Sequence, residues 1–277
     1  MAKVLEANPY APHVARLARV VPETPSIKTF CFDLKGPIEF RAGQFVQLGV
    51  PGVGEAPFTP SSSPLDPKHL EVTVLRTGTV TDRLHEMAEG DACLLRGPYG
   101  KGFPLEKLAD KEVLVVGGGV GLAPLRALIY MLLSMTERLR KVVIKYGARE
   151  SAELLFRRQY QDWAKAPKTS LELTIDRPEP GWNGRVGVVT TLLENIGAEV
   201  DLANAYAFTC GPEIMLKFVT LRLLEKGFKP EQIYLSMNRR MSCGIGKCGR
   251  CNIGPYYLCK DGPDICYAKI KDYPDVF

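Results

Sequence analysis

The sequence predicts an antiparallel β-barrel domain, then an α/β domain with a parallel sheet, and then a small C-terminal subdomain rich in cysteine. Short alternating or β-branched runs separated by Pro and Gly turns fill residues 14–95, which is typical of a small antiparallel barrel or sandwich. From residue 111, apolar strands alternate with helical stretches, which indicates a parallel sheet covered on both faces. Five of the eight cysteines lie in the last 35 residues. We therefore expect domains at residues 1–106, 107–235 and 236–277.

Composition excludes several classes of protein. With 277 residues, 45% hydrophobic and 24% charged, the chain has enough apolar content to bury a core and is not disordered. A net charge of +5 is too small and too scattered to indicate nucleic-acid binding. The apolar run at 113–133 contains four glycines, Pro124 and Arg126, so we interpret it as strand, loop and helix rather than a membrane span. The start, MAKVLEANPY, lacks an apolar signal region, and we expect a cytoplasmic protein.

The expected elements follow from local pattern. The barrel strands are VARLARVV, IKTFCFDL, QFVQLGV, LEVTVLR and DACLLRG. In the second domain we expect strands at VLVV, KVVIKYGA, LELTID and AYAFTCG, with helices over residues 124–135, 151–164 and 213–227.

A glycine-rich loop follows the first strand of the second domain. Gly117, Gly118, Gly119 and Gly121 separate that strand from a helix that has Pro124 in its first turn. Glycines let a backbone approach a pyrophosphate, and the free N–H groups of a helix start favour an anion. The spacing is not G-x-G-x-x-G, and no acidic residue follows about 20 positions later. A tight turn that binds nothing is the alternative.

Two other strands of this domain end in loop-type residues. One ends in KYGARES, which places Arg149 at its carboxyl edge, where it could serve a ribose or phosphate. Another ends in FTCGPEIM, which brings Cys210, Gly211 and Pro212 to the same edge. Because open parallel sheets bind ligands at the carboxyl ends of their strands, three such ends predict a site.

The cysteine tail has the spacing of a metal-cluster loop. Cys243, Cys248 and Cys251 follow the C-x4-C-x2-C pattern of plant-type [2Fe–2S] proteins, with glycines between them. The cluster needs four thiolates, so Cys259 or Cys266 must supply the fourth. A structural zinc site is the alternative, although C-x4-C with glycines is less usual for zinc.

Taken together, the barrel, the glycine-loop domain and the ferredoxin-like cysteines resemble the ferredoxin–NADP+ reductase superfamily over nearly the whole chain. That family binds flavin through Arg-x-Tyr-Ser/Thr, and EAPFTPSSSP is similar to it. The resemblance implies that Pro57 and Phe58 contact the flavin, with Phe58 against the isoalloxazine ring, and that Thr59 lies near flavin N5. Ala56 stands where the family has arginine.

A second segment, LRTGTVTDRL, resembles the other flavin-binding segment of the family. By this resemblance the residues that line the flavin are Val74, Leu75 and Arg76. Those that hold its pyrophosphate at a helix start are Gly78, Thr79, Val80 and Thr81. Barrel turns rich in Ser, Thr and Pro that bind no ligand are the alternative for both segments.

The nicotinamide motifs of the family are also matched. Gly-Gly-x-Gly-x-x-Pro is present with Gly118, Gly119, Val120, Gly121 and Pro124, and Cys-Gly-Pro with Cys210, Gly211 and Pro212. The resemblance places Cys210 beside the nicotinamide ring, so that Thr59 and Cys210 are the expected catalytic residues. The alternative for Cys210 is a buried small hydrophobe at a strand end.

The tail, CGIGKCGRC followed by YLCKDGPDI, is similar to three groups within the superfamily. These are the flavin subunits of NAD(P)-linked hydrogenases, the electron-transfer subunits of dihydroorotate dehydrogenase B, and anaerobic sulfite reductases. In them the cysteine ahead of x-Asp-Gly-Pro is the fourth ligand, which implies Cys259 and leaves Cys266 spare. The opening NPYAPHVARLARVVPETPSIKTF is most similar to the hydrogenase subunits.

The resemblance implies an oxidoreductase that moves electrons between NAD(H) or NADP(H), FAD, a [2Fe–2S] cluster and a partner, with the catalytic and iron–sulfur subunits of a hydrogenase first among the partners. Alternatives are a dihydroorotate dehydrogenase, sulfite reductase or electron-bifurcating complex, a reductase of a soluble acceptor, and a zinc-stabilised redox or interaction module without turnover. NADH and NADPH both remain open: Arg149, Arg157 and Arg158 could meet a 2′-phosphate, although solvated helix charges are the favoured interpretation.

Overall fold

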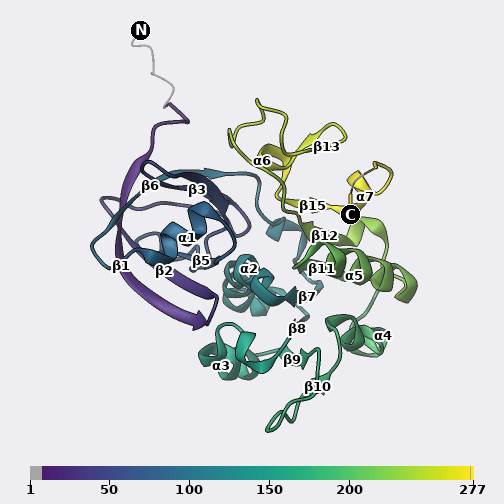
Figure 1. The fold of residues 1–277 in the computed structure, drawn as a ribbon. Helices are drawn as coiled ribbons and strands as arrows, with labels where there is room; N and C mark the ends of the chain where they lie inside the picture. The colour runs from purple at the N-terminus through teal and green to yellow at the C-terminus, as the bar shows by residue number, and fades with distance from the viewer. Residues whose placement is uncertain (1–7, 275) are drawn as a thin grey trace.

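The computed structural model describes residues 8–274, 276 and 277 of the chain. Figure 1 shows an N-terminal barrel beside an α/β sheet domain, with the C-terminal tail against both. The predicted fold class is confirmed: a six-stranded antiparallel sheet precedes a seven-stranded sheet that is mostly parallel. The domain boundaries at residues 106 and 235 stay predictions.

The first sheet has the order β4-β3-β6-β1-β2-β5. Its strands are β1 (His13–Thr24), β2 (Ile27–Leu34), β3 (Phe45–Val50), β4 (Gly54–Phe58), β5 (Leu70–Leu75) and β6 (Ala92–Tyr99). Pro60, two residues after the end of β4, forms a bridge with Val72 of β5, and this contact closes the sheet into a barrel. Helix α1 (Thr79–Glu86) packs against β3 and β4 and buries Leu84 completely.

The second sheet has the order β10-β9-β8-β7-β11-β12-β15. Its strands are β7 (Glu112–Gly118), β8 (Lys141–Ala148), β9 (Thr169–Ile175), β10 (Arg185–Val186), β11 (Ala205–Cys210), β12 (Ile233–Ser236) and β15 (Asp264–Cys266). All neighbours are parallel except β12 and β15. The antiparallel strand β15 comes from the cysteine tail, so the tail completes the edge of this sheet.

Helices surround the second sheet and the tail. The α-helices are α2 (Leu122–Ser134), α3 (Tyr160–Lys165), α4 (Ile196–Glu199), α5 (Glu213–Lys226), α6 (Leu258–Asp261) and α7 (Tyr267–Ile270). The 3-10 helices are η1 (Leu105–Lys107), η2 (Gly119–Gly121), η3 (Thr136–Arg138), η4 (Ser151–Glu153), η5 (Arg157–Gln159), η6 (Val189–Leu193) and η7 (Pro230–Gln232). The tail also holds a small hairpin, β13 (Asn252–Ile253) with β14 (Tyr256–Tyr257). No helix in the described part of the chain is long and apolar enough to cross a bilayer.

The predicted helix over residues 151–164 is wrong in its first half. The chain there forms two short 3-10 turns, and only α3 is α-helical. Leu154, Leu155 and Phe156 are all buried, and Phe156 has a left-handed backbone with φ 56°. A helix cannot bury three consecutive side chains against one surface. The segment is therefore not α-helical, and this lets all three side chains pack in the core.

A buried ion pair joins the barrel to the sheet domain. The Arg126 guanidinium on α2 lies 2.5 Å from the Glu71 carboxylate on β5 and 2.8 Å from the Gln159 side chain. The Phe156 ring centroid lies 4.4 Å from the guanidinium carbon, and the Tyr130 ring centroid 5.2 Å from it. Because the Arg126 side chain is 5% exposed, its charge depends on these partners rather than on water.

We expect Arg126→Met to lower the free energy of unfolding by about 3 kcal/mol. The substitution removes the buried cation that pairs with the Glu71 carboxylate. Urea unfolding followed by circular dichroism measures the change. Arg140→Met is the matched control: its pair with Asp110 is exposed on both sides, and its loss should cost less than about 1 kcal/mol. Equal losses in the two variants would contradict the assignment of Arg126 as the domain link.

Candidate functional site

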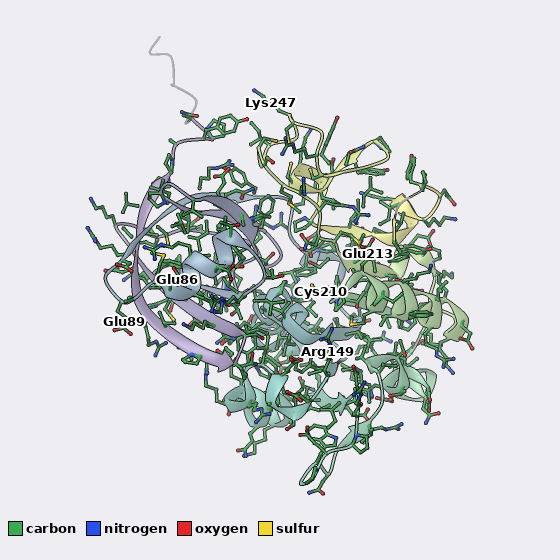
Figure 2. The ribbon with its side chains drawn as sticks, viewed as in Figure 1. Glu86, Glu89, Arg149, Cys210, Glu213 and Lys247 are labelled. Atoms are coloured by element: carbon green, nitrogen blue, oxygen red, sulfur yellow. The ribbon has the colours of Figure 1, made fainter. Side chains whose placement is uncertain are left out.

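The carboxyl ends of three neighbouring strands meet at one rim of the second sheet. The register places Gly117 of β7 opposite Cys210 of β11, and Gly118 opposite Gly147 of β8. Arg149 follows β8 and is exposed. Figure 2 shows Cys210 in the middle of the molecule, between the barrel and α5. The structure therefore brings the glycine loop, Cys210 and the end of β8 together, as the sequence predicts.

Several glycines at this rim are required by close packing. A Cβ on Gly121 would overlap the carbonyl of Cys210, so the glycine loop touches the end of β11 directly. A Cβ on Gly118 or on Gly211 would overlap the side chain of Met215, which lies on α5. Glycine at these positions therefore lets two strand ends and α5 approach one another.

Gly119 differs from its neighbours. Its φ is +53°, a left-handed conformation that favours glycine, and the space beside it is open. Its carbonyl accepts a hydrogen bond of 3.1 Å from the Tyr146 hydroxyl, which holds the loop in place. Val120 is half-buried beside it, Pro124 is the third residue of α2, and Pro212 is the residue before α5. The open side of Gly119, at the start of α2, fits a phosphate group.

The predicted flavin-binding residues of the barrel lie at the ends of two strands. Pro57 and Phe58 end β4 and are partly buried, and Thr59 follows them. Val74 and Leu75 end β5. The apolar side chains from both flavin segments belong to one hydrophobic cluster with residues of the nicotinamide segments: Phe58, Val74, Leu75, Val80, Val120 and Cys210. Strand β5 and the glycine-loop 3-10 helix η2 also contact each other, so these parts of the two sets of segments adjoin.

The start of α1 has the features of an anion site. The Thr81 hydroxyl accepts hydrogen bonds from the N–H groups of Thr77 and Gly78, each 2.8 Å long, and donates one to the Gly78 carbonyl. Thr79, Val80 and Thr81 form the first turn, whose N–H groups have no partner within a helix. The space beside Gly78 is open. These donors fit a pyrophosphate.

Arg76 is exposed and makes a salt bridge of 2.9 Å with Asp82 on α1. Its backbone N–H donates to the Ser26 carbonyl. The backbone N–H and the guanidinium of Arg76 are therefore both engaged within the barrel domain, and its predicted flavin contact stays a prediction.

A cavity of about 770 Å³ opens elsewhere on the barrel. It is lined by the middle of β1, the end of β2, Ser62 and Ser63, Glu71, and Arg126. None of the predicted cofactor residues lines it. Leu34 and Leu70 belong to its wall, whereas Val74 lies at the opposite end of β5. The cavity is therefore separate from the rim and from the start of α1.

Four cysteines of the tail come together in two pairs. Cys243 contacts the Cys248 thiol, and Cys259 contacts the Cys251 thiol. Backbone N–H groups point at the sulfurs: Gly246 donates to Cys259 Sγ at 3.1 Å, and the Cys259 N–H donates to Cys251 Sγ at 3.4 Å. Within the described residues, no three Cys, His, Asp or Glu side chains are arranged to hold a single metal ion. Two pairs of thiols suit a two-iron cluster, in which each iron takes two protein sulfurs.

The surroundings of Cys243 favour a thiolate. Burial by itself would raise its pKa, but N–H groups of Ile245, Cys248 and Lys247 and the Cys248 thiol outweigh that effect and lower the pKa to about 6. Burial and the neighbouring Cys251 raise the pKa of Cys259 to about 12. Thiols held this close together would bind a metal cluster as thiolates and release their protons to solvent.

Cys266 lies apart from these four thiols. It is on β15, opposite Tyr234, and its thiol donates to the carbonyls of Pro230 and Glu231. Of the four gathered cysteines, Cys248 is exposed while the other three are buried. The site formed by these four cysteines therefore has one exposed edge, at Cys248.

Sequence reasoning missed the residues that hold the cluster loop on the barrel. Arg96 of β6 donates to the carbonyls of Ser242, at 2.6 Å, and Cys243, at 2.9 Å, and it also pairs with Glu55. The Glu55 hydrogen bond is the main cause that raises the pKa of Arg96 above its ordinary value. Gln47 of β3 donates to the Met241 carbonyl. An arginine in the middle of a barrel strand was the available signal, because charged residues are seldom buried without a partner.

Arg158, an alternative contact for a 2′-phosphate, is paired instead. It lies 2.9 Å from the Glu23 carboxylate, whose side chain is 3% exposed. The arginine is thus engaged with the barrel and is neither a free phosphate ligand nor a simple solvated charge.

Comparisons with known proteins agree with this geometry. Family models match at residues 15–103 (oxidoreductase FAD-binding domain), 115–220 (oxidoreductase NAD-binding domain) and 238–271 (iron–sulfur cluster binding domain of dihydroorotate dehydrogenase B). Each of the three regions described above thus matches a family model.

Whole-chain relatives point the same way. The chain is 35% identical to the sulfhydrogenase 1 subunit gamma of Pyrococcus furiosus, over 96% of this chain and 94% of the relative. It is 36% identical to a probable dihydroorotate dehydrogenase B (NAD+) electron transfer subunit of Thermococcus kodakarensis, over 86% and 88%. A solved structure of an NADH-dependent reduced ferredoxin–NADP oxidoreductase superposes with a TM-score of 0.74 at 26% identity, covering 93% of this chain and 91% of that one.

The positions of the tail cysteines generate a direct test. Cys259→Ser should remove most of the bound iron and acid-labile sulfide, because it takes away one of four gathered thiols. Cys266→Ser is the matched control and should retain both, since its thiol binds backbone carbonyls elsewhere. Iron and sulfide analysis of protein purified without air measures the difference. Loss of iron in Cys266→Ser with retention in Cys259→Ser would reverse the assignment.

Arg96→Met should loosen the cluster loop without removing a ligand. The variant loses the hydrogen bonds to the Ser242 and Cys243 carbonyls and leaves Glu55 unpaired. We expect the half-life of the cluster in the presence of an iron chelator to shorten by about tenfold, measured by the decay of visible absorption. Arg76→Met, whose pair is exposed, is the control and should decay as the wild-type protein does.

Proposed function

The chain belongs to the ferredoxin–NADP+ reductase superfamily, together with sulfhydrogenase gamma subunits and dihydroorotate dehydrogenase B electron-transfer subunits, and from this premise we propose how it works. It exchanges electrons between NAD(P)H, FAD and a [2Fe–2S] cluster as one subunit of a larger redox complex. The observation that carries the proposal is the attachment of the four-cysteine loop to the barrel through Arg96. This attachment supports the proposal, because it holds the cysteine loop against the barrel that carries the proposed flavin-binding residues.

Each cofactor has a set of residues that fits it. FAD would be held by Phe58 and Thr59 at the end of β4, by the end of β5, and by the start of α1, where the space beside Gly78 is open to a pyrophosphate. The nicotinamide dinucleotide would be held at the rim of the second sheet, by Gly119 at its phosphate and by Cys210 at its nicotinamide. Flavin, when bound, converts the two-electron hydride chemistry of nicotinamide into the single electrons that an iron–sulfur cluster carries.

The chain's own residues orient these groups. Phe58 offers a flat apolar face, and the Thr59 hydroxyl offers a donor and acceptor beside it. Cys210 is buried, and burial raises its pKa to about 12, so the thiol stays neutral at physiological pH. A neutral thiol places no charge beside a hydride donor. Arg149 is exposed at the end of β8, from which it meets a ribose or phosphate of the nucleotide.

The cluster is held by Cys243, Cys248, Cys251 and Cys259. Three of these are buried, and Cys248 is exposed. One-electron transfer between proteins needs a partner close to the cluster, so the partner docks over the Cys248 edge. We propose hydrogenase catalytic and iron–sulfur subunits as the partners, since the gamma subunits of sulfhydrogenases are similar over almost the full chain. A reducing cytoplasm suits eight unpaired cysteines.

The test starts from protein purified without air. We expect two irons and two sulfides per FAD, no zinc, bleaching of the flavin by NADH or NADPH, and a paramagnetic signal from the reduced cluster. Cys259→Ser should still bleach with the nucleotide but show no cluster signal. Zinc in place of iron, with no flavin, would contradict the proposal and support an interaction module without turnover. Co-purification of hydrogenase subunits tests the partner.

A further inference from the structure

The tail supplies a third polar side chain to the row that contains Cys210. Strand register places Ser236 of β12 opposite Asp264 of β15, and Thr209 of β11 opposite Leu235. Cys210 and Ser236 are the next residues along these parallel strands, so Cys210, Ser236 and Asp264 lie side by side across three strands on one face. The Ser236 side chain hydrogen-bonds the Cys210 thiol. Asp264 therefore stands one strand beyond the hydroxyl that contacts the thiol.

Asp264 also contacts the barrel. A Cβ on Gly43, in the turn before β3, would overlap the Asp264 carboxyl group, and the same position is 2.8 Å from the Phe103 ring. Asp264 thus lies where the barrel, the sheet and the cysteine tail meet. It is 5% exposed, and within the described residues no hydrogen bond of good geometry satisfies either carboxyl oxygen. The Ser236 hydroxyl is the polar side-chain group that interacts with this carboxyl.

The surroundings keep this carboxyl neutral. Burial raises the pKa of Asp264 well above its ordinary value, and the nearby Ser236 hydroxyl offsets only part of the effect. Gly43 and Phe103, which pack against it from the barrel side, carry no charge. Cys210 is the titratable group whose charge interacts with it. Further along the same face, Cys266 and Tyr234 are opposite each other, and Tyr234 binds Lys107.

A carboxyl in this position costs stability. Its folded pKa lies above its unfolded pKa, so the folded state holds a proton that the unfolded state releases once the pH exceeds about 4. Stability therefore falls as pH rises above that value and until the folded group itself ionises. An amide or an apolar side chain of similar size would avoid this cost. A residue that lowers stability, and whose cost no structural interaction offsets, is a candidate for a functional role.

We propose that Asp264, as a neutral carboxylic acid, is a positioning residue for the hydride-transfer site: with Ser236 it holds the Cys210 thiol toward the nicotinamide. The inference rests on the proposed function, which places the nicotinamide beside Cys210. A thiol on a single rotatable bond needs a partner to fix its direction, and Ser236 is that partner. Asp264 offers an O–H donor that turns the Ser236 hydroxyl toward Cys210. Through β15, the cluster-binding tail thus completes the nicotinamide site.

The test compares Asp264→Asn, which keeps a neutral donor, with Asp264→Val, which removes it. Stopped-flow measurement of flavin bleaching by NADH or NADPH gives the rate of hydride transfer. We expect Asp264→Val to slow transfer about tenfold with little change in nucleotide KM, and Asp264→Asn to restore it to within about threefold. Ser236→Ala should resemble Asp264→Val, and the two changes combined should cost no more than one. Cys266→Ser, on the same strand and face, is the control and should transfer at the wild-type rate.

A second readout is independent of activity. Asp264→Asn should melt at a higher temperature than the wild-type protein at pH 7 to 8, and the difference should shrink as the pH falls toward 4. The wild-type transfer rate should also fall at alkaline pH as Asp264 ionises, and Asp264→Asn should lack that fall. Melting curves and pH profiles of the flavin-loaded protein measure both effects.

Several outcomes would overturn the inference. Hydride transfer at the wild-type rate in Asp264→Val would show that the carboxyl has no part in the site. Equal slowing in Asp264→Asn and Asp264→Val would mean that Asp264 exchanges a proton rather than positions the thiol. Equal melting temperatures at every pH would show that the carboxyl is ionised. If Asp264→Val fails to fold, Ser236→Ala and Asp264→Asn decide the question. A wild-type protein that NADH and NADPH both fail to bleach would instead contradict the proposed function.

Discussion

The hydrogen bonds of one buried arginine define how the cysteine tail of this protein meets the barrel. Arg96 lies in a barrel strand, yet its guanidinium binds the backbone of the cysteine loop at Ser242 and Cys243. A buried guanidinium must satisfy its donors, so detachment of the loop would break the hydrogen bonds of Arg96 to the Ser242 and Cys243 carbonyls. Glu55 balances that charge. The cluster site is therefore part of the barrel interface rather than an independent appendage.

The glycine-rich rim of the second domain depends on close packing within that domain. Gly118 and Gly211 admit the Met215 side chain, and Gly121 admits the Cys210 carbonyl. These glycines satisfy packing, whereas Gly119 has open space beside it. The glycines of one motif can therefore have two roles. Some of them let strand ends pack closely, and another leaves its backbone accessible to a ligand. Arg126 adds the second anchor, because its pair with Glu71 joins α2 to the barrel behind the rim.

Local patterns predicted most of the architecture because they carry their own physical cause. Alternation in the barrel strands, apolar runs in the parallel strands, and Pro124 at the start of α2 each reflect the geometry of a single element. The segment 151–164 shows the limit of that approach. Its composition favours a helix, but the burial of Leu154, Leu155 and Phe156 decides otherwise. Burial against distant elements outweighs a helical preference of a few tenths of a kcal/mol per residue.

The sequence by itself determined the order of the domains, the glycine loop, and the spacing of Cys243, Cys248 and Cys251, since these depend on neighbours along the chain. From the residues alone, the fourth cysteine stayed open between Cys259 and Cys266, and the family resemblance chose Cys259. Only the tertiary structure decided where those two thiols lie, how Arg96 reaches the cluster loop, and that Asp264 of the tail joins the row of Cys210. Strand register and the packing of a barrel against a sheet bring together residues that are far apart in sequence. A local sequence pattern contains no information about such contacts.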